Sequence, residues 1–382
     1  MSDYPVISWH ETGEEKSARW RSENGSPPPR RVLIADDRMT ADTAYRQACE
    51  GNALLWRGDF QNARQLLQAI ARRIDKKPRN RKKKKIAHTP AEAFHLLRQA
   101  QSQRARTLGM LLLPFDADHS VPLRRAPDVR SACIEAYGVA TESYIASLRS
   151  LQGLIGAYEW RKSGLEIPAL GVRIHPHYGV FSPIRSEYVG LVVRAPLPNQ
   201  AMTQSVVFDI GTGTGVLAAV LAGRGIKRIV ATDQDLRALN CARENLTQLG
   251  FIDQVDLVQT DLFPEGQAEL IVCNPPWIPA RPSSPLEHAI FDPESRMLKG
   301  FLSGLTAHLA PGGEGWLILS DLAEHLELRT RVELLAAIDA AGLKVLSKSD
   351  VKPHHPRVSD TSDPLHAARA AELTSLWRLT AK

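Results

Sequence analysis

The 382-residue sequence is poor in cysteine and has no long hydrophobic segment. Its four cysteines, Cys49, Cys133, Cys241 and Cys273, lie far apart and form no Cys-x-x-Cys pair, which argues against a disulfide framework or a thiolate metal site. No apolar run approaches the ~20 residues that a membrane-spanning helix needs. The charged, proline-rich N-terminus also lacks the apolar core of a signal peptide. We therefore expect a cytoplasmic protein with reduced thiols, no membrane segment and no metal.

The composition is that of a globular protein with a modest basic excess. Hydrophobic residues make up 43% of the chain, enough for buried cores and against wholesale disorder. The length suits two domains rather than one. The formal net charge of +6 favours an anionic partner but carries no information about the fold.

The N-terminal half is predicted to contain a flexible leader, residues 1–30, followed by a mainly helical domain, residues 31–164, with a possible role in substrate recognition. Apolar residues recur at three- and four-residue spacing over 60–74, which indicates an amphipathic helix. Residues 36–50 and 89–106 are expected to form two more. Between the second and third helices lies Arg72–Lys85, in which ten of fourteen residues are Lys or Arg. Such a run repels itself, so it is either a solvated loop or an arm that binds RNA phosphates.

From residue 165 to 382 the pattern changes to short apolar strands that alternate with helices. The seven expected strands cover residues 205–210, 228–233, 255–260, 268–273, 314–320, 343–351 and 372–380. Helices separate the first strand from the second, the second from the third and the fourth from the fifth, which predicts a parallel sheet covered on both faces, and the last two strands form an antiparallel pair. The predicted fold is an open, doubly wound α/β layer, which binds ligands at the carboxyl ends of its strands.

A glycine-rich motif follows the first of these strands and opens a helix. Its glycines are Gly211, Gly213 and Gly215, and Asp209 precedes the first of them by two residues. The spacing differs from the Gly-x-Gly-x-x-Gly of dinucleotide-binding folds, and no Lys-Ser/Thr follows as in a P-loop. An acid beside the loop repels a pyrophosphate but suits a cationic sulfonium that also carries an ammonium group.

Two further acids stand at the ends of the next strands. Asp233 lies 18 residues after Gly215, where its carboxylate can accept hydrogen bonds from both hydroxyls of a ribose. Asp261 ends the third strand and can meet an adenine amino group. The alternative for both is that they only cap the segments that follow.

The fourth strand is followed by Asn274, Pro275, Pro276 and Trp277. The prolines restrict the backbone and remove two N–H donors, so the Asn274 side-chain oxygen and the Pro275 carbonyl can accept hydrogen bonds from a substrate amino group. This holds the nitrogen lone pair toward a methyl donor. The flat face of Trp277 suits a planar amide or base.

Together, Asp209–Gly215, Asp233, Asp261 and Asn274–Trp277 resemble the class I (Rossmann-like) S-adenosylmethionine-dependent methyltransferases of the Asn-Pro-Pro-aromatic group. That group methylates adenine N6 or guanine N2 of nucleic acids, or glutamine N5 of release factors and ribosomal proteins. Residues 179–187 also resemble the strap that precedes the glycine loop in the glutamine enzymes, and by this resemblance Phe181 and Pro183 wall the cofactor.

The chain departs from that pattern at two places. It carries Trp277 where the glutamine enzymes usually have Tyr, and Ile278–Met297 does not follow their pattern. The resemblance implies S-adenosylmethionine as cofactor, with Asn274 contacting both substrate and cofactor. It also implies a macromolecular substrate, and we expect an RNA base of rRNA or tRNA ahead of a protein. The alternatives are a protein glutamine-N5 methyltransferase and a non-catalytic RNA-binding protein built on this fold.

Overall fold

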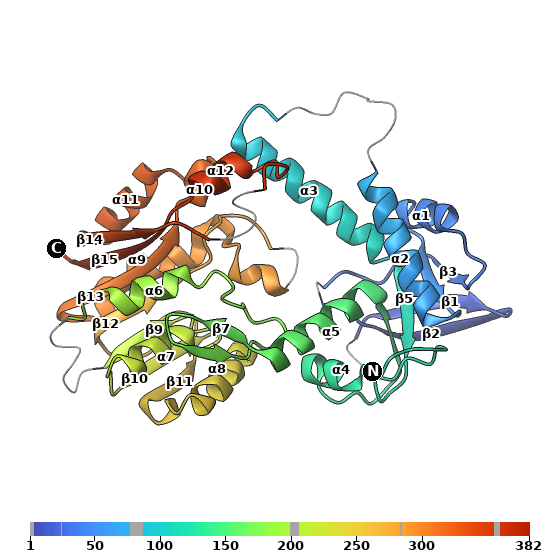
Figure 1. Ribbon diagram of the computed structural model, residues 1–382, viewed down its shortest axis with the longest axis horizontal. Coiled ribbons are helices and arrows are strands. Elements are labelled where there is room, and N and C mark those ends of the chain that lie inside the picture. Colours follow the sequence, from blue (N-terminus) through green and yellow to red (C-terminus); the bar gives the residue numbers. More distant parts are fainter. Residues whose placement is uncertain (1–3, 24, 77–86, 199–205, 283–284, 355–359) are drawn as a thin grey trace. The chain divides into compact units, whose positions relative to one another are not determined.

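The computed structural model describes residues 4–382 apart from 24, 77–86, 199–205, 283–284 and 355–359 (Figure 1). The chain divides into two compact units. Unit 1 comprises Met1–Ile86 and His95–Glu159, and unit 2 comprises Ala87–Phe94 and Trp160–Lys382. In the described part of the chain, no helix is both long and apolar enough to cross a membrane.

Unit 1 contains a six-stranded sheet in the order β1-β2-β6-β5-β4-β3. Its strands are β1 Val6–Glu11, β2 Glu14–Trp20, β3 Val32–Ala35, β4 Ala53–Trp56, β5 Leu111–Phe115 and β6 Tyr144–Ser147. Strands β3, β4 and β5 are parallel neighbours, whereas β1 and β6 pair antiparallel with β2 and β5. The helices are α1 Ala41–Cys49, α2 Phe60–Asp75, α3 Pro90–Leu108, α4 Arg130–Tyr137 and α5 Leu148–Ser163, the start of α3 and the end of α5 belonging to unit 2.

The predicted helices of this half begin at well-defined caps. The Asp59 side chain accepts a hydrogen bond from the Gln61 N–H at the start of α2. Thr89 accepts one from the Glu92 N–H at the start of α3. Capping satisfies N–H groups that have no partner within a helix. The helix expected over 36–50 starts later than predicted, at Ala41, because Thr40 caps it.

One prediction for this half was wrong and another was incomplete. Residues 1–30 are not a loose leader throughout, because β1 and β2 form a hairpin that buries Ile7 and Trp9. The mainly helical description missed the sheet, although helices still hold more residues than strands. Strands such as β4 are buried along their whole length, so their sequences lack the alternation that marks a half-exposed strand. Of the basic segment 72–85, residues 72–75 end α2, and residues 77–85 lie outside the described residues.

Unit 2 contains a seven-stranded sheet in the order β11-β10-β9-β12-β13-β15-β14. The strands are β9 Val207–Ile210, β10 Ile229–Asp233, β11 Val255–Gln259, β12 Ala268–Cys273, β13 Leu309–Ser320, β14 Leu343–Val351 and β15 Thr374–Ala381. Strands β9 to β13 are parallel, and β15 runs antiparallel to both β13 and β14. The predicted seven-stranded, doubly wound sheet is confirmed, including its antiparallel pair.

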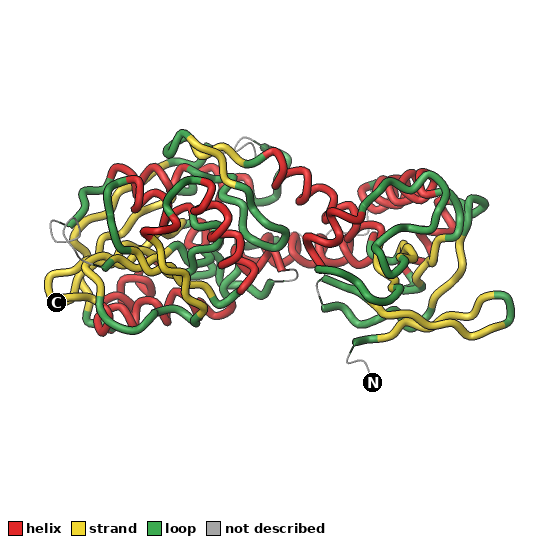
Figure 2. Tube along the Cα trace, turned by 90° about the horizontal axis from the view of Figure 1, so that it is seen from below, coloured by secondary structure: helices red, strands yellow, loops and turns green. Residues whose placement is uncertain are grey.

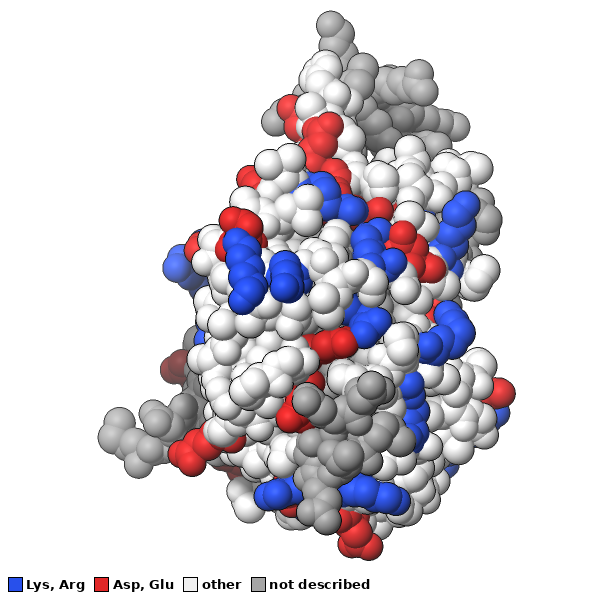
Figure 3. Space-filling model, turned by 90° about the vertical axis from the view of Figure 1, so that its left-hand side faces the viewer, with Lys and Arg blue, Asp and Glu red and all other residues white. Residues whose placement is uncertain are grey.

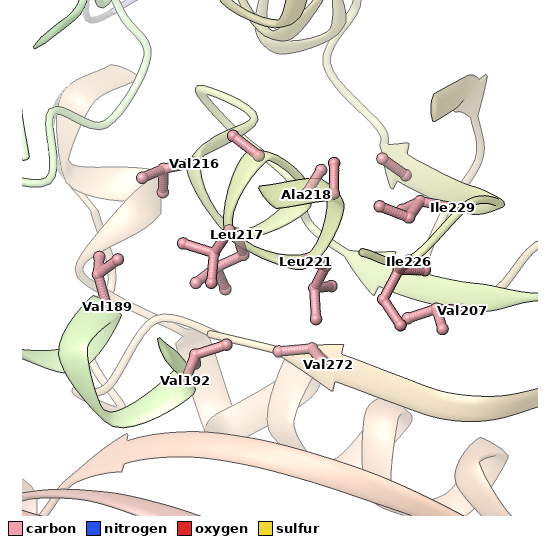
Figure 4. Packing of buried hydrophobic residues seen from close by; sticks show 14 of the residues in the cluster. Val189, Val192, Val207, Val216, Leu217, Ala218, Leu221, Ile226, Ile229 and Val272 are labelled. Carbon is pink, nitrogen blue, oxygen red and sulfur yellow. The ribbon is translucent and has the colours of Figure 1, made fainter. Parts of the chain in front are cut away.

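Both faces of this sheet are covered. Val207 packs with the apolar residues of α6 (Glu187–Arg194) and α7 (Val216–Gly223), as Figure 4 shows. The next residue, Phe208, packs on the other face with α9 (Arg296–His308) and α11 (Arg331–Ala340). Successive side chains of a strand point to opposite faces. The continuous apolar runs of these strands therefore contribute side chains to two hydrophobic cores, one on each face of the sheet.

The remaining elements of unit 2 are shorter or lie at its margins. They are α8 Leu236–Gln248, α10 Leu322–His325, α12 His366–Ala371, the hairpin of β7 Leu165–Ile167 and β8 Val172–Ile174, and the 3-10 turns Ile252–Gln254, Pro285–Ala289 and Pro293–Ser295. Figure 2 shows the strands of this unit with helices around them. The carboxyl ends of β9, β10 and β12 meet at one edge, because these strands are neighbours in the sheet.

Candidate active site

The site lies at the carboxyl edge formed by β10, β9 and β12. Asp209 is in β9, Asp233 is the last residue of β10, and Asn274 directly follows β12. The topology therefore brings together three residue groups that are up to 65 positions apart in the sequence.

Each glycine of the loop has positive φ, but the three have different surroundings. A Cβ on Gly211 would lie 2.7 Å from the Met297 methyl carbon, and one on Gly215 would lie 3.2 Å from Ala242. A Cβ on Gly213 (φ +55°) would meet nothing within 4 Å. Gly211 and Gly215 thus permit close packing of the loop, whereas Gly213 leaves its outer side open for a ligand to approach the backbone.

Asp209 is fully buried beneath this loop. Its Oδ2 accepts hydrogen bonds from the Thr212 hydroxyl at 2.7 Å and the Ala218 N–H at 3.1 Å. Its Oδ1 is buried and has no hydrogen-bond partner among the described residues. Burial raises the pKa of Asp209 to about 6. An unsatisfied buried carboxylate oxygen is costly, and a cationic group beside it would relieve that cost.

Asp233 holds the loop from the adjacent strand. Its Oδ2 accepts a hydrogen bond from the Gly213 N–H at 3.1 Å, and its Oδ1 accepts one from the Asp235 N–H at 3.0 Å. Burial raises the pKa of this carboxyl as well. Each oxygen keeps an acceptor site beyond these bonds, so the geometry suits the predicted pair of ribose hydroxyls.

The structure gives Asp261 a different partner from the one predicted. It follows β11, it is exposed, and its carboxylate forms an ion pair with the guanidinium of Arg296. The predicted contact with an adenine amino group would compete with this ion pair. That role of Asp261 stays a prediction.

A buried asparagine that the sequence analysis missed joins the segment just before the strap to the glycine loop. The Asn245 Oδ1 accepts a hydrogen bond from the His175 N–H at 2.7 Å, and its Nδ2 donates to the Thr214 carbonyl at 3.0 Å. The sequence signal is a polar residue on the apolar side of the helix over 235–249. Further along the strap, Val180 is buried with residues of α8 and Phe181 is half-buried, so its predicted role as a cofactor wall stays a prediction.

The Asn-Pro-Pro-Trp motif forms a short connected turn after β12. The Trp277 indole N–H donates to the Asn274 Oδ1 at 2.9 Å, an interaction that the sequence analysis did not foresee. Beyond it, the Asp292 N–H donates to the Ile278 carbonyl at 2.8 Å. The Asp292 carboxylate accepts from the N–H groups at the start of α9, so Asp292 is a helix cap.

Comparison with known proteins identifies this architecture. Residues 171–335 match the family model described as the methyltransferase small domain. The tRNA1(Val) (adenine(37)-N6)-methyltransferase of Shewanella loihica is 31% identical over 180 residues, covering 42% of this chain and 72% of that protein. The chain belongs to the small-domain methyltransferases.

Other relatives are named after protein rather than tRNA substrates. The release factor glutamine methyltransferase of Cereibacter sphaeroides is 38% identical over 115 residues, and this chain spans only 37% of its length. The ribosomal protein L11 methyltransferase of Pelotomaculum thermopropionicum is 28% identical over 255 residues, covering 65% of this chain and 72% of that protein. The predicted resemblance is therefore confirmed at the level of the family.

The residues present fit S-adenosylmethionine, the methyl donor of this family. The buried Asp209 carboxylate suits its cationic end, Gly213 leaves room beside the backbone, and Asp233 offers acceptors for the ribose. The donor supplies an electrophilic methyl group on a sulfonium, and the protein supplies position and charge.

We expect S-adenosylmethionine to bind more weakly as the pH falls from 7.5 to 5. The pKa of Asp209 is raised to about 6, so at pH 5 only about a tenth of the free protein carries the charged form and affinity falls by about tenfold. Isothermal titration calorimetry at the two pH values measures this. In Asp209→Asn the dependence should flatten to the part that Asp233 contributes, and equal steepness in both proteins would contradict the assignment.

The same raised pKa fixes the sign of its effect on stability. Because the folded pKa of Asp209 lies above the ordinary value of 3.8, the folded protein binds this proton more tightly than the unfolded chain does. Its stabilising contribution is complete below pH 3.8 and is lost as the pH rises through about 6. Above that pH the ligand-free protein retains an uncompensated buried charge, which a bound cation offsets.

Proposed function

We propose that this protein transfers the methyl group of S-adenosylmethionine to a planar nitrogen of an RNA base. The observation that carries the proposal is the position of Asn274, directly after β12 and beside the strand that bears the glycine loop. The remaining lone pair of its Oδ1 and the Pro275 carbonyl accept N–H bonds from the substrate amino group. As the new carbon–nitrogen bond forms and the carbon–sulfur bond of the donor breaks to leave a neutral thioether, these acceptors stabilise the positive charge on nitrogen, and its proton then leaves to water.

The distribution of charge supports RNA over protein as the substrate. Unit 1 carries 26 Lys or Arg and 17 Asp or Glu, a net charge of +9, whereas unit 2 carries 22 and 25, a net charge of −3. The face of the molecule in Figure 3 has Lys and Arg interspersed with Asp and Glu rather than gathered in a patch. The basic excess therefore lies outside the methyltransferase domain, as expected if unit 1 supplies phosphate contacts.

A protein glutamine is the second candidate, because the relative from Cereibacter sphaeroides is named a release factor glutamine methyltransferase. The strap over residues 179–187 and the loop Asp209–Gly215 are the parts of the chain that favour it. Both substrates present a planar nitrogen to the same acceptors, so the site chemistry is shared. The proposed location of the reaction, for either substrate, is the cytoplasm.

Transfer of labelled methyl from S-adenosylmethionine into an extract of cells that lack this protein tests the proposal. We expect label in the RNA fraction that survives protease and is released by nuclease. Label that resists nuclease and disappears with protease would instead establish the protein candidate. Label in neither fraction would contradict both.

The basic segment offers a separate test of the RNA partner. Replacing Lys82 to Lys85 with Ser should weaken RNA binding and flatten its dependence on salt. The magnitude of the log–log salt slope should fall by up to ~0.9 for each phosphate that the variant no longer neutralises, or by ~0.7 for single-stranded RNA. Filter binding between 50 and 300 mM salt measures both the affinity and the slope.

The matched control for the basic segment removes the same charge from unit 2. It replaces Lys227, Arg228, Lys299 and Lys344, which are exposed, with Ser, and we expect its salt slope to stay near that of the wild type. An equal flattening of the slope in both variants would mean that net charge alone drives binding. An unchanged slope in the Lys82–Lys85 variant would remove this segment from the interface.

A further inference from the structure

We propose that Tyr188 and Trp277 are positioning residues that hold the Asn274 side-chain amide in one orientation for methyl transfer. This inference rests on the proposed role of Asn274 in the reaction. One hydrogen bond and one side-chain interaction carry it. The Trp277 indole N–H donates to the Asn274 Oδ1 at 2.9 Å, and the side chain of Tyr188, in the first turn of α6, interacts with that of Asn274 and packs against the Trp277 ring.

The chemistry of the indole decides which end of the amide faces which partner. An indole N–H only donates, whereas an amide has one accepting and one donating end. The oxygen of Asn274 must therefore face Trp277. The Nδ2 end is then the donor, and the Tyr188 oxygen is the acceptor that we assign to it. A flipped amide would set its own N–H groups against the indole N–H and leave both without an acceptor.

Tyr188 is suited to this task because it is buried and protonated. Its side chain is 2% exposed, burial raises its pKa, and the nearby Asp209 carboxylate raises it further. The hydroxyl thus stays neutral and keeps the lone pair that Asn274 Nδ2 requires. Tyr188 therefore lies near both Asp209, the acid beneath the glycine loop, and Asn274, the residue proposed to orient the substrate.

Trp277 is itself held by surrounding side chains. The Arg185 guanidinium carbon lies 5.1 Å from the indole ring centre, and the Tyr188 ring stands at 89° to it with centres 6.4 Å apart. Arg185 in turn pairs with Glu187 at 3.2 Å and with the buried Glu372 at 2.9 Å. The arginine lies over the indole and so helps to fix the ring whose N–H donates to Asn274, and the stacking role expected from the sequence stays a prediction.

The substitution of Trp for Tyr at the fourth position of the motif therefore has a chemical consequence. A tyrosine hydroxyl both donates and accepts and would tolerate either orientation of the asparagine. The indole N–H, which can only donate, permits a single orientation of the amide. One lone pair of the Asn274 Oδ1 remains available, which is the acceptor that a substrate N–H needs.

The first test needs no substrate, so it remains decisive if the proposed RNA substrate is wrong. In a 1H–15N spectrum of the full-length protein, the Trp277 indole signal is assigned by its disappearance in Trp277→Phe. We expect Asn274→Ala to move that signal upfield and to speed its exchange with solvent, and Tyr188→Phe to do the same to a smaller extent. An indole signal unchanged in Asn274→Ala overturns the proposal, and one unchanged only in Tyr188→Phe overturns the role of Tyr188.

The second test measures turnover on total RNA from cells that lack this protein, at saturating S-adenosylmethionine. Tyr188→Phe should lower kcat by about 3- to 10-fold with KM changed by less than about twofold, the effect of removing one hydrogen bond. Added to Asn274→Ala, it should cause no further loss. Equal losses in both backgrounds would show that Tyr188 only supports the fold, and would overturn the proposal.

The matched control for the turnover test is Tyr144→Phe in unit 1. Tyr144 is also a buried tyrosine, and its hydroxyl lies 2.9 Å from the His119 Nδ1, so its kcat should equal that of the wild type. If total RNA accepts no methyl group, total protein from the same cells replaces it. If neither accepts methyl, the proposed function fails, and the indole signal alone decides the positioning role.

Discussion

Replacing Asn274 with alanine is expected to lower turnover by ~100-fold or more while the affinity for S-adenosylmethionine stays near that of the wild type. Asn274 supplies an acceptor that strengthens as positive charge grows on the substrate nitrogen, and removal of one such preorganised group costs about two to three orders of magnitude in kcat. Cofactor affinity is spared because the contacts assigned to the cofactor come mainly from Asp209, the glycine loop and Asp233.

Single-turnover kinetics and calorimetry on the same Asn274→Ala preparation separate the two effects. Asn52→Ala is the matched control, because Asn52 is a buried asparagine of unit 1 whose amide donates to Gln47 at 2.7 Å. A similar loss of turnover in both variants would indicate general destabilisation. Wild-type turnover in Asn274→Ala would mean that another group orients the nitrogen, and the proposed mechanism would be wrong.

The second large effect is expected from Asp233→Ala, which should weaken S-adenosylmethionine binding by about 100-fold or more. The variant cannot form the two charge-assisted hydrogen bonds to the ribose, each contributing ~1.5–3 kcal/mol. The carboxylate also accepts the Gly213 N–H, so the loop loses a support at the same time. Calorimetry measures the affinity, and a thermal melt confirms that the variant is folded.

Asp235→Ala separates a cofactor contact from a helix-start effect. Asp235 lies two residues away and caps α8 by accepting the Arg237 N–H at 2.8 Å. Its replacement should lower stability by ~0.5–2 kcal/mol and leave cofactor affinity near wild type. Unchanged affinity in a folded Asp233→Ala protein would exclude Asp233 as the ribose acid.

The fold of unit 2 was predictable because local sequence signals mark the ends of its helices and strands. The strand Ala268–Cys273 and the strand Leu343–Val351 have the predicted bounds, and the helix Leu236–Gln248 begins directly after Asp235, whose side chain caps it. Short apolar runs separated by glycine, proline and capping residues give this result. The order of the strands depends on long-range pairing, which no local pattern encodes, so it was not predicted and is known from the structure.

The sheet of unit 1 illustrates the opposite case. The strand Ala53–Trp56 is buried on all four residues, and a short apolar run of that kind is equally compatible with a buried turn of helix. The hairpin over residues 6–20 was missed for another reason. Its charged residues suggested a solvent-exposed segment without fixed structure. Ile7 and Trp9 nevertheless alternate with polar residues and face a core.

At the site, the sequence predicted which residues lie close together but not how they are connected. Asp209, Asp233 and Asn274 stand at strand ends, so their convergence followed from the predicted topology. The bond between Trp277 and Asn274 and the bridge through Asn245 depend on side-chain rotamers and on packing between distant segments. These contacts require the folded structure.

The most direct test of the central claim is a crystal structure of the full-length protein with S-adenosylhomocysteine. The predicted result has the ribose hydroxyls on the Asp233 carboxylate, the amino acid end over Gly211–Gly215 near Asp209, and the sulfur facing Asn274. A ligand bound elsewhere, or one whose sulfur points away from Asn274, would contradict the assignment of this strand edge as the site of methyl transfer.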